Sequence, residues 1–215
     1  MKNILIGMVA MSCVALAGEG TNLYLSTGID ISGKFEEAKV SNGKQSQNLN
    51  KHDSEKSGFE LTAEVTKEMV PNLELGLGLS YQDHDRPEAL HVSKEKVTIK
   101  NTGYKSMPLY LVGKYNIPVE SNVKPYLKAN LGYSFNFGEK DLSLKEEKDS
   151  LKVGTSIDNG LYYGVGAGIE YNNFIVELMY KANQADIEYK HSGVKLKDSY
   201  DYSRTTLSFG YKFNF

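Results

Sequence analysis

The sequence predicts an all-β protein, an eight-stranded antiparallel transmembrane up-and-down β-barrel with four long loops at one end. Three observations predict this fold. Apolar and polar residues alternate in eight stretches, the connections between the stretches alternate between short and long, and the polar face of the stretches is rich in glycine and in charges of both signs. An alternation of period two is the spacing of side chains on one face of a strand.

The first 17 residues predict a signal peptide that is not part of the fold. Lys2 supplies a positive start, an apolar run follows over residues 4–14, and Ala15-Leu16-Ala17 has the small-x-small form of a cleavage site. The apolar run is shorter than the roughly 20 residues of a transmembrane helix. We therefore expect a signal peptide over residues 1–17, cleaved at the site marked by Ala15 and Ala17, and a barrel over residues 18–215.

Cys13, the one cysteine of the chain, lies inside the apolar run. A lipoprotein signal is the alternative reading of this cysteine. It is disfavoured because Ala10, rather than leucine, stands three residues before it and apolar residues continue past it. The predicted mature chain contains no cysteine and hence no disulfide.

Each predicted strand places apolar residues on one face and small or polar residues on the other. In the first strand the polar face is expected to run through the even-numbered residues Tyr24 to Lys34, with Ser32 among them. Outside the signal peptide no stretch keeps a helical period. The eight predicted strands are 22–35, 59–69, 73–82, 107–116, 123–136, 161–171, 174–181 and 204–215.

The connections alternate in length along the chain. The short ones are EMVPN, IPVESN and the pair Asn172-Asn173, which suits the positive φ angles of a two-residue hairpin turn. Both termini fall at the short-turn end. Barrels of bacterial outer membranes have this asymmetry, with short periplasmic turns and long extracellular loops. The four predicted loops are 36–57, 83–103, 137–159 and 183–202.

A soluble sandwich or lipocalin-like barrel also alternates, with its apolar face inward. The polar face favours the membrane barrel, because glycines such as Gly78 and Gly166 would weaken a solvent-facing strand but relieve crowding in a narrow lumen. Six acids and seven bases on that face nearly neutralise one another. They are Asp30, Glu60, Glu64, Glu74, Glu170 and Glu177, with Lys34, Lys114, Lys124, Lys128, Lys181, Arg204 and Lys212.

Strand length and aromatic placement agree with a membrane. Ten residues at about 3.3 Å each, tilted by roughly 40°, rise about 25 Å, the height of the apolar band of such barrels. Aromatic residues of the apolar face cluster near strand ends, as in the two interfacial girdles. Toward the short turns these are Tyr115, Tyr171, Phe174, Phe213 and Phe215, and toward the loops Phe35, Tyr81, Tyr133, Phe135 and Tyr180.

The C-terminal segment FGYKFNF carries a resemblance to a known family. With Phe209, Gly210, Tyr211, Phe213 and Phe215 in these positions, it resembles the C-terminal assembly signal of bacterial outer-membrane barrels. The whole mature chain resembles the small eight-stranded family of outer membrane proteins A and X and the opacity-type surface antigens. The resemblance implies an outer-membrane location, recognition of the C-terminus by the barrel-assembly machinery, and closure of the last strand against the first.

Two short motifs are compatible with catalysis. His91-Val92-Ser93 has the His-x-Ser form of an outer-membrane lipid A deacylase family, but it lies within a charged loop rather than on a strand. Asp83-His84-Asp85 resembles the acid-histidine clusters of outer-membrane proteases, a family that needs ten strands and a second acidic pair. We therefore expect no catalytic, metal or cofactor site. The four histidines are His52, His84, His91 and His191, without metal-ligand spacing.

Period two continues into the loops, in KVTIK, DLSLK and DIEYKHSGVKLK. We expect some strands to extend beyond the bilayer as hairpins. Their edges are either available to an extended segment of a partner or protected from pairing by their lysines. Deletion of residues 184–200 would test binding by the last of these hairpins.

Three classes of function remain open. The favoured one is a non-enzymatic surface barrel for envelope structure or for contact with host or cell-surface proteins. The second is a narrow gated channel, in which Arg204 and Lys128 against Glu64 and Glu177 form a charged plug. The third is a lipid-modifying enzyme. Outer-membrane lipid and the assembly machinery are the expected partners, the barrel is expected to be a monomer, and the net charge of −2 gives no reason to expect nucleic acid.

Overall fold

The structure is a computed structural model of the chain of 215 residues. The residues that it describes are 19–35, 39–42, 45–48, 52–53, 58–84, 90–92, 97–99, 104–138, 142–145, 150–191, 194–199 and 201–215.

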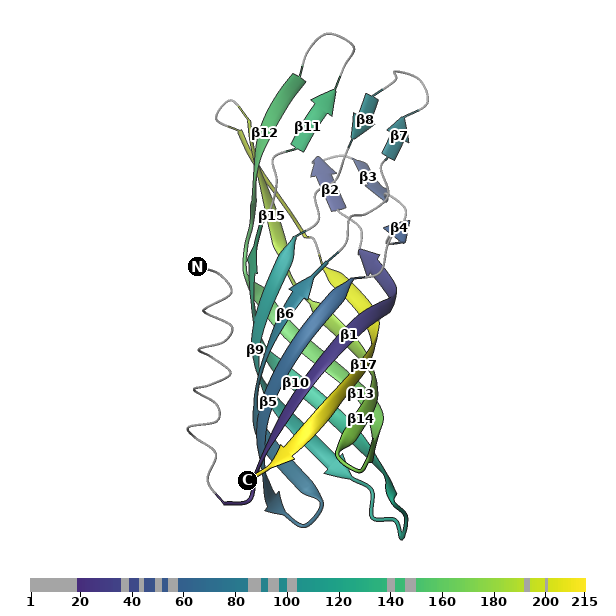
Figure 1. The fold of residues 1–215 in the computed structure, drawn as a ribbon. Helices are drawn as coiled ribbons and strands as arrows, with labels where there is room; N and C mark the ends of the chain where they lie inside the picture. Colours follow the sequence, from purple (N-terminus) through teal and green to yellow (C-terminus); the bar gives the residue numbers. More distant parts are fainter. Residues whose placement is uncertain are drawn as a thin grey trace.

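Eight long strands form a closed antiparallel barrel, as predicted (Figure 1). Each strand pairs with the next long strand along the chain, and the last one, β17, pairs with β1 to close the sheet. The observed strands match the predicted ranges to within two residues at each end. They are β1 (Thr21–Phe35), β5 (Phe59–Val70), β6 (Leu73–Asp83), β9 (Lys105–Asn116), β10 (Val123–Phe137), β13 (Gly160–Tyr171), β14 (Phe174–Asn183) and β17 (Tyr202–Asn214).

Short turns join the strands at the end where β1 begins and β17 ends (Figure 1). Asn172 and Asn173 both have positive φ, 47° and 70°, which is the two-residue hairpin geometry that the sequence predicts. Asn72, in the turn between β5 and β6, also has positive φ, 69°, and its backbone N–H donates to Glu68. Asparagine tolerates this left-handed conformation better than most residues.

Among the described residues, nine short strands lie beyond the other end of the barrel (Figure 1). Six of them form a sheet in the order β16-β15-β12-β11-β8-β7, so the period-two loop segments do form hairpins. β2 pairs with β3, and β4 pairs with the end of β1. The nine are β2 (Lys39–Asn42), β3 (Gln45–Asn48), β4 (His52–Asp53), β7 (Leu90–Val92), β8 (Val97–Ile99), β11 (Leu142–Lys145), β12 (Ser150–Ile157), β15 (Asp186–His191) and β16 (Val194–Ser199).

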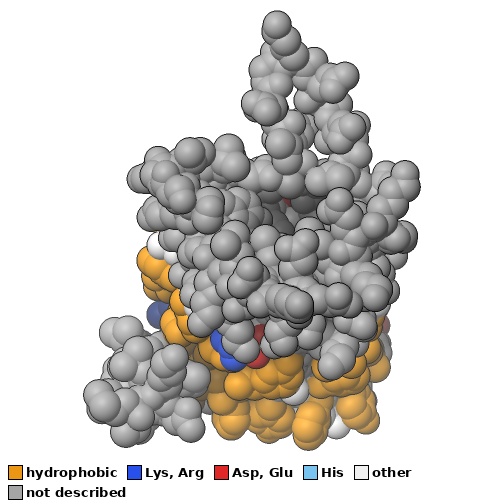
Figure 2. All heavy atoms as spheres, turned by 90° about the horizontal axis from the view of Figure 1, so that it is seen from above, with side chains coloured by type: hydrophobic (Ala, Val, Ile, Leu, Met, Phe, Trp, Pro, Cys, Tyr) orange, Lys and Arg blue, Asp and Glu red, His pale blue; other side chains and the backbone are white. Residues whose placement is uncertain are grey.

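The barrel is apolar outside and polar inside. Large hydrophobic side chains are exposed around the wall, with Leu111 63% and Val165 59% accessible, whereas acids and bases occupy the interior. Figure 2, seen from above, shows hydrophobic side chains gathered along the outer wall. Of the predicted girdle residues, Tyr115, Phe174 and Tyr133 are among those exposed. A wall of this polarity faces lipid. It excludes the alternative of a soluble barrel with an apolar core.

No helix among the described residues is both long and apolar enough to cross a membrane.

One prediction for β1 is wrong. The pairing of β1 with β17 shifts register between Asp30 and Ser32, which makes Ile31 the extra residue of a β-bulge. Beyond the bulge the faces exchange, so Ser32 and Lys34 are exposed on the outer wall instead of lining the interior. Gly33 faces the interior in their place. A β-carbon at this position would fall onto the Tyr202 side chain.

Candidate functional site

The barrel interior holds three groups of ion-paired side chains at successive heights, which together contain eleven of the thirteen charged residues predicted for the lumen; the other two, Lys34 and Lys124, are exposed, and the prediction for them is wrong. Ten of the eleven are buried, and Lys212 at the periplasmic end is partly exposed. We call the groups the periplasmic cluster, the central cluster and the outer cluster. They consist, in that order, of Glu74, Lys114, Glu170 and Lys212; of Glu64, Lys128 and Glu177; and of Asp30, Glu60, Lys181 and Arg204.

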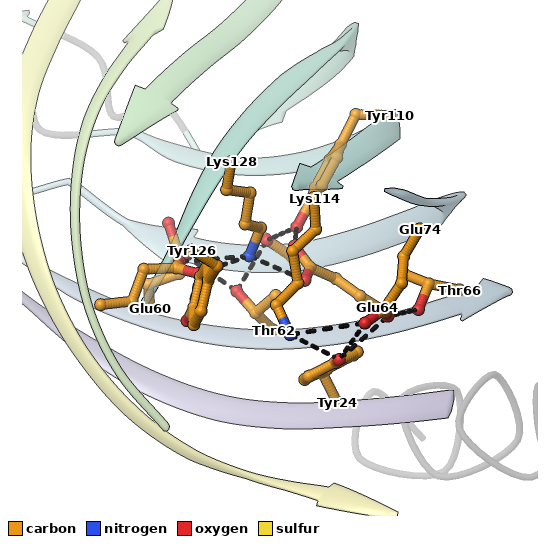
Figure 3. A network of polar contacts seen from close by, with 12 residues as sticks. Tyr24, Glu60, Thr62, Glu64, Thr66, Glu74, Tyr110, Lys114, Tyr126 and Lys128 are labelled. Carbon is orange, nitrogen blue, oxygen red and sulfur yellow. Dashed lines mark hydrogen bonds and ion pairs between the residues drawn. The ribbon is translucent and has the colours of Figure 1, made fainter. Parts of the chain in front are cut away.

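Lys128 is the hub of the central cluster (Figure 3). Its Nζ lies 2.7 Å from Oε2 of Glu64 and 2.9 Å from Oε2 of Glu177. Tyr110 donates a hydrogen bond of 2.8 Å to Glu64, and Tyr126 donates one of 3.1 Å to Glu177. Because these groups come from β5, β9, β10 and β14, the cluster connects opposite walls across the lumen.

In the periplasmic cluster, Lys114 Nζ lies 3.1 Å from Glu170 and 3.6 Å from Glu74, and it donates to the Tyr24 hydroxyl at 2.7 Å. Lys212 adds a contact of 3.3 Å to Glu170. Tyr24 in turn donates to Glu74 at 2.9 Å. Glu74 therefore has its charge compensated although it is buried. It also accepts hydrogen bonds from Asn22, Thr66 and Asn116.

Arg204 organises the outer cluster. Its guanidinium lies 3.0 Å from Oε2 of Glu60 and 3.4 Å from Oδ1 of Asp30, and it donates to Asn183 at 2.7 Å. Lys181 pairs with the other oxygen of Glu60. The prediction that Arg204 pairs with Glu64 and Glu177 is wrong. Arg204 lies on β17 at the height of the outer cluster, and its acids come from β1 and β5.

The three clusters are connected to one another. The Lys114 ammonium lies 4.4 Å from the centre of the Tyr126 ring, which joins the periplasmic and central clusters by a cation–π contact. A chain of hydroxyls from Tyr110 through Ser80 and Thr62 to Glu60 joins the central and outer clusters, with steps of 3.2, 2.8 and 2.9 Å. The interior is one polar network from the periplasmic end to the outer end.

Tyr110 and Tyr126 are buried residues of this network that were not predicted from the sequence. Their signal was available, since Tyr110 and Tyr126 share the strand face of the charges. Each stands directly across from a glycine, Gly78 for Tyr110 and Gly168 for Tyr126, and a β-carbon at either glycine would fall onto the tyrosine ring. Covering a strand glycine with a neighbouring aromatic ring stabilises curved sheets.

The two ends of the lumen differ. At the periplasmic end a cavity of about 740 Å³ opens between the turn after β9 and the ends of β1, β6 and β17. Glu170 and Lys212 line it, and the exposed Lys124 stands at its rim. At the outer end Tyr104, Ile157, Ala185 and Tyr202 form a buried apolar cluster.

Neither candidate catalytic motif is assembled among the described residues. Asp83 forms an ion pair of 2.8 Å with Lys105, whereas His84 is buried between aromatic rings, and Asp85 lies outside the described residues. His91 and Val92 lie in β7, and Ser93 falls outside the part that the structure describes. Within the described part, no three or more histidine, cysteine or acidic side chains group as metal ligands.

The C-terminal residues complete the barrel wall. Phe213 pairs with Leu23 of β1, and the Phe215 backbone N–H donates to the Thr21 carbonyl at 2.9 Å. Phe209, Phe213 and Phe215 are exposed on the outer wall, and Gly210 lies against the backbone of β1. The predicted signal peptide, with Ala15 and Ala17, lies outside the described residues.

A closed barrel with an apolar wall, a charged interior and long loops at one end defines an outer-membrane β-barrel protein. The family model "Outer membrane protein beta-barrel domain" matches residues 4–213, and the chain belongs to this family. Its place is the outer membrane.

One relative and two solved structures define what the chain is similar to. The protein PM1543 of Pasteurella multocida is 28% identical over 244 residues, covering 99% of this chain and 98% of the relative. The outer membrane protein OprG of Pseudomonas aeruginosa superposes with a TM-score of 0.58 at 15% identity, covering 93% of this chain and 98% of OprG. The outer membrane protease OmpT of Escherichia coli gives 0.50 at 12% identity, with 89% and 97% covered. These structural likenesses show the fold alone, which hosts an enzyme as well.

Proposed function

We propose that the protein is a non-enzymatic surface barrel that is closed to ions, supports the structure of the outer membrane and presents its loop sheet to external partners. One observation carries the proposal: the three connected clusters cross the lumen from wall to wall. Each buried acid and base of the network has an oppositely charged partner among the described residues. Buried charges with such partners are expensive to separate, which favours a rigid, filled interior.

The same contacts argue against catalysis by the interior. A general acid or base needs access to a substrate and a proton that it can exchange. Glu64 and Glu177 are occupied by Lys128 and by tyrosine hydroxyls, and both are buried. We therefore assign the network a structural role.

Two surfaces of the protein, the apolar barrel wall and the loop sheet, indicate which partners it contacts. The exposed apolar wall contacts outer-membrane lipid, and the barrel has no unpaired strand edge that would require a second copy, which favours a monomer. Among the described residues, the six-stranded sheet beyond the barrel ends at β7 and β16, each of which pairs with one strand of the sheet. It is the surface that we assign to host or cell-surface proteins, and binding that survives deletion of residues 184–200 would remove β15 and β16 from that role.

A gated channel is the second candidate, because Lys128 lies between two carboxylates and a cavity reaches the network from the periplasmic end. If the Lys128 side chain moved to contact Glu64 alone, Glu177 would lose its ion pair and a path for ions would open beside Glu177.

Planar-bilayer recording separates the two candidates. We expect the reconstituted wild-type barrel to be silent at every voltage at neutral pH, because the three clusters cross the lumen. Voltage-dependent openings in the wild type would overturn the closed barrel in favour of the channel. For the enzyme alternative, lipid A masses that change on overexpression would contradict a non-enzymatic role.

A further inference from the structure

His84 occupies the outer end of the lumen, directly after β6 ends at Asp83. Its ring is held between those of Tyr104 and Tyr202, with centroids 4.7 and 4.8 Å away, and the residue is 2% exposed. The two tyrosines pack with Ile157 and Ala185 in the apolar cluster already described. We call these five residues the aromatic cap. They come from the ends of β6, β12, β14 and β17 and from the residue before β9, so the cap joins strand ends around the barrel mouth.

Hydrogen bonds determine which nitrogen of His84 carries the proton. Ser106 Oγ donates to Oδ1 of Asn136 at 2.7 Å and therefore has only a lone pair to offer His84. His84 Nε2, 2.8 Å from Ser106 Oγ, must be the donor. The Asn136 amide group then donates to the Asp158 carbonyl at 2.9 Å, so the relay reaches the junction of β12 and β13.

The other ring nitrogen of His84, Nδ1, takes no part in this hydrogen-bond relay. Nδ1 of His84 is buried and has no hydrogen-bond partner among the described residues. A neutral ring leaves only a lone pair there, whereas a protonated ring would bury a second N–H without an acceptor. An unpaired buried donor that carries positive charge is far more costly than an unpaired acceptor.

Some charged groups near His84 lower its pKa and others raise it. Burial lowers the pKa of His84 well below its usual range, the positive charge of Arg204 lowers it further, and Glu60 opposes them more weakly. Glu60 already shares its charge with Arg204 and Lys181. Tyr104 and Tyr202 present neutral phenols, and the neighbouring Asp83 pairs with Lys105.

We infer that the aromatic cap is an acid-sensitive seal on the extracellular mouth of the lumen, which opens when His84 is protonated and leaves the pocket. An exposed histidine has a pKa of about 6.5, and the closed cap holds a lower one, so the closed form loses stability as the pH falls below about 6.5. The ratio of open to closed cap then rises about tenfold for each pH unit, until the pH reaches the closed-state value. The inference is independent of the proposed function, because the clusters below the cap still fill the lumen when it opens.

Hydrogen exchange of the mature barrel in lipid nanodiscs tests the seal. After correction for the intrinsic effect of pH, backbone amides in residues 104–106, 157–162 and 202–204 should exchange about tenfold faster per pH unit below about 6.5. His84→Gln keeps a donor for Ser106 but cannot be protonated, so it should lose this acid response. His191→Gln, which changes another histidine, should keep it. No acid response in the wild type, or an equal response in His84→Gln, would overturn the inference.

Histidine NMR of the wild type provides a second test that needs no variant to fold. The ring of His84 should show the Nε2–H tautomer and should resist protonation at pH values where the other histidines titrate. A ring that carries its proton on Nδ1, or that titrates together with exposed histidines, would contradict the seal.

Discussion

At the scale of single residues, the balance of the interior depends on a few cations that each serve two acids. Lys128 holds both Glu64 and Glu177, and among the described residues no other base forms an ion pair with either of them. Removing one partner of a buried ion pair costs far more than the pair itself contributes, because the remaining charge is left without compensation. Removing the Lys128 charge would leave two buried carboxylates, Glu64 and Glu177, without compensation.

We therefore expect Lys128→Met to lower the free energy of unfolding by about 3–5 kcal/mol, measured by urea titration in lipid vesicles. Lys124→Met is the matched control, since Lys124 is exposed at the periplasmic rim, and it should change the value by less than about 0.5 kcal/mol. Adding Glu64→Gln and Glu177→Gln to Lys128→Met should restore part of the loss. Equal effects of the two lysine substitutions would show that the central cluster contributes no stability.

At the scale of strands, glycines and tyrosines alternate along one row of paired residues across four neighbouring strands. The register places Gly78 of β6 across from Tyr110 of β9, Tyr110 across from Gly132 of β10, and Gly132 across from Tyr162 of β13. A β-carbon at Gly78 would fall onto the Tyr110 ring, and a β-carbon at Gly132 would fall onto the Leu109 carbonyl and onto Cα and Cβ of Tyr110. The conformational cost of glycine in a strand is thereby offset by packing in the lumen.

Gly78→Ala should destabilise the barrel by about 1–3 kcal/mol, because the new methyl group would overlap the Tyr110 ring. Gly113→Ala is the matched control on β9, where the nearest heavy atom, Leu75 Cδ2, would lie 3.6 Å from the new carbon on the outer wall. It should be neutral or slightly stabilising in the same urea titration. Destabilisation by Gly113→Ala of the same size would mean that strand geometry, rather than the tyrosine, requires glycine.

The strands and their faces were predictable from the sequence because period two identifies both at once. The exception is the end of β1, where Ile31 and Ser32 are both exposed and Lys34 follows them outward. A bulge adds one residue against a single partner, and whether it occurs depends on β17, whose Thr206 lies 176 positions from its partner Asp30. Local alternation carries no information about it.

At the scale of the whole molecule, the partners in the interior could not be predicted for a related reason. The alternation of residues along each strand identifies which charged side chains face the lumen. The shift in register between neighbouring strands decides which of these side chains lie at the same height in the barrel. Arg204 therefore pairs with Asp30 and Glu60 rather than with the acids of the central cluster. The His84 relay was equally hidden, since its members come from separate strand ends.

The C-terminal assembly signal can be tested separately from packing. Phe215 is 46% exposed and lies beyond the end of β17, so Phe215→Ala should refold into detergent or lipid as the wild type does. In cells it should reduce the amount of heat-modifiable barrel in the outer membrane several-fold. Phe174→Ala, which removes another exposed aromatic residue at the same end, should assemble normally. A loss of refolding in vitro would assign Phe215 a structural role instead.

The ion pair between Glu60 and Arg204 joins residues 144 positions apart, and the hydrogen bond from Thr206 to Asp30 spans 176. Neither contact exists until the final strand has arrived, so a partly inserted sheet would hold bare charges against hydrocarbon. Such an intermediate is penalised on its charged face in hydrocarbon and on its apolar face in water. We therefore expect the charged face to stay beside water until the last strand closes the sheet.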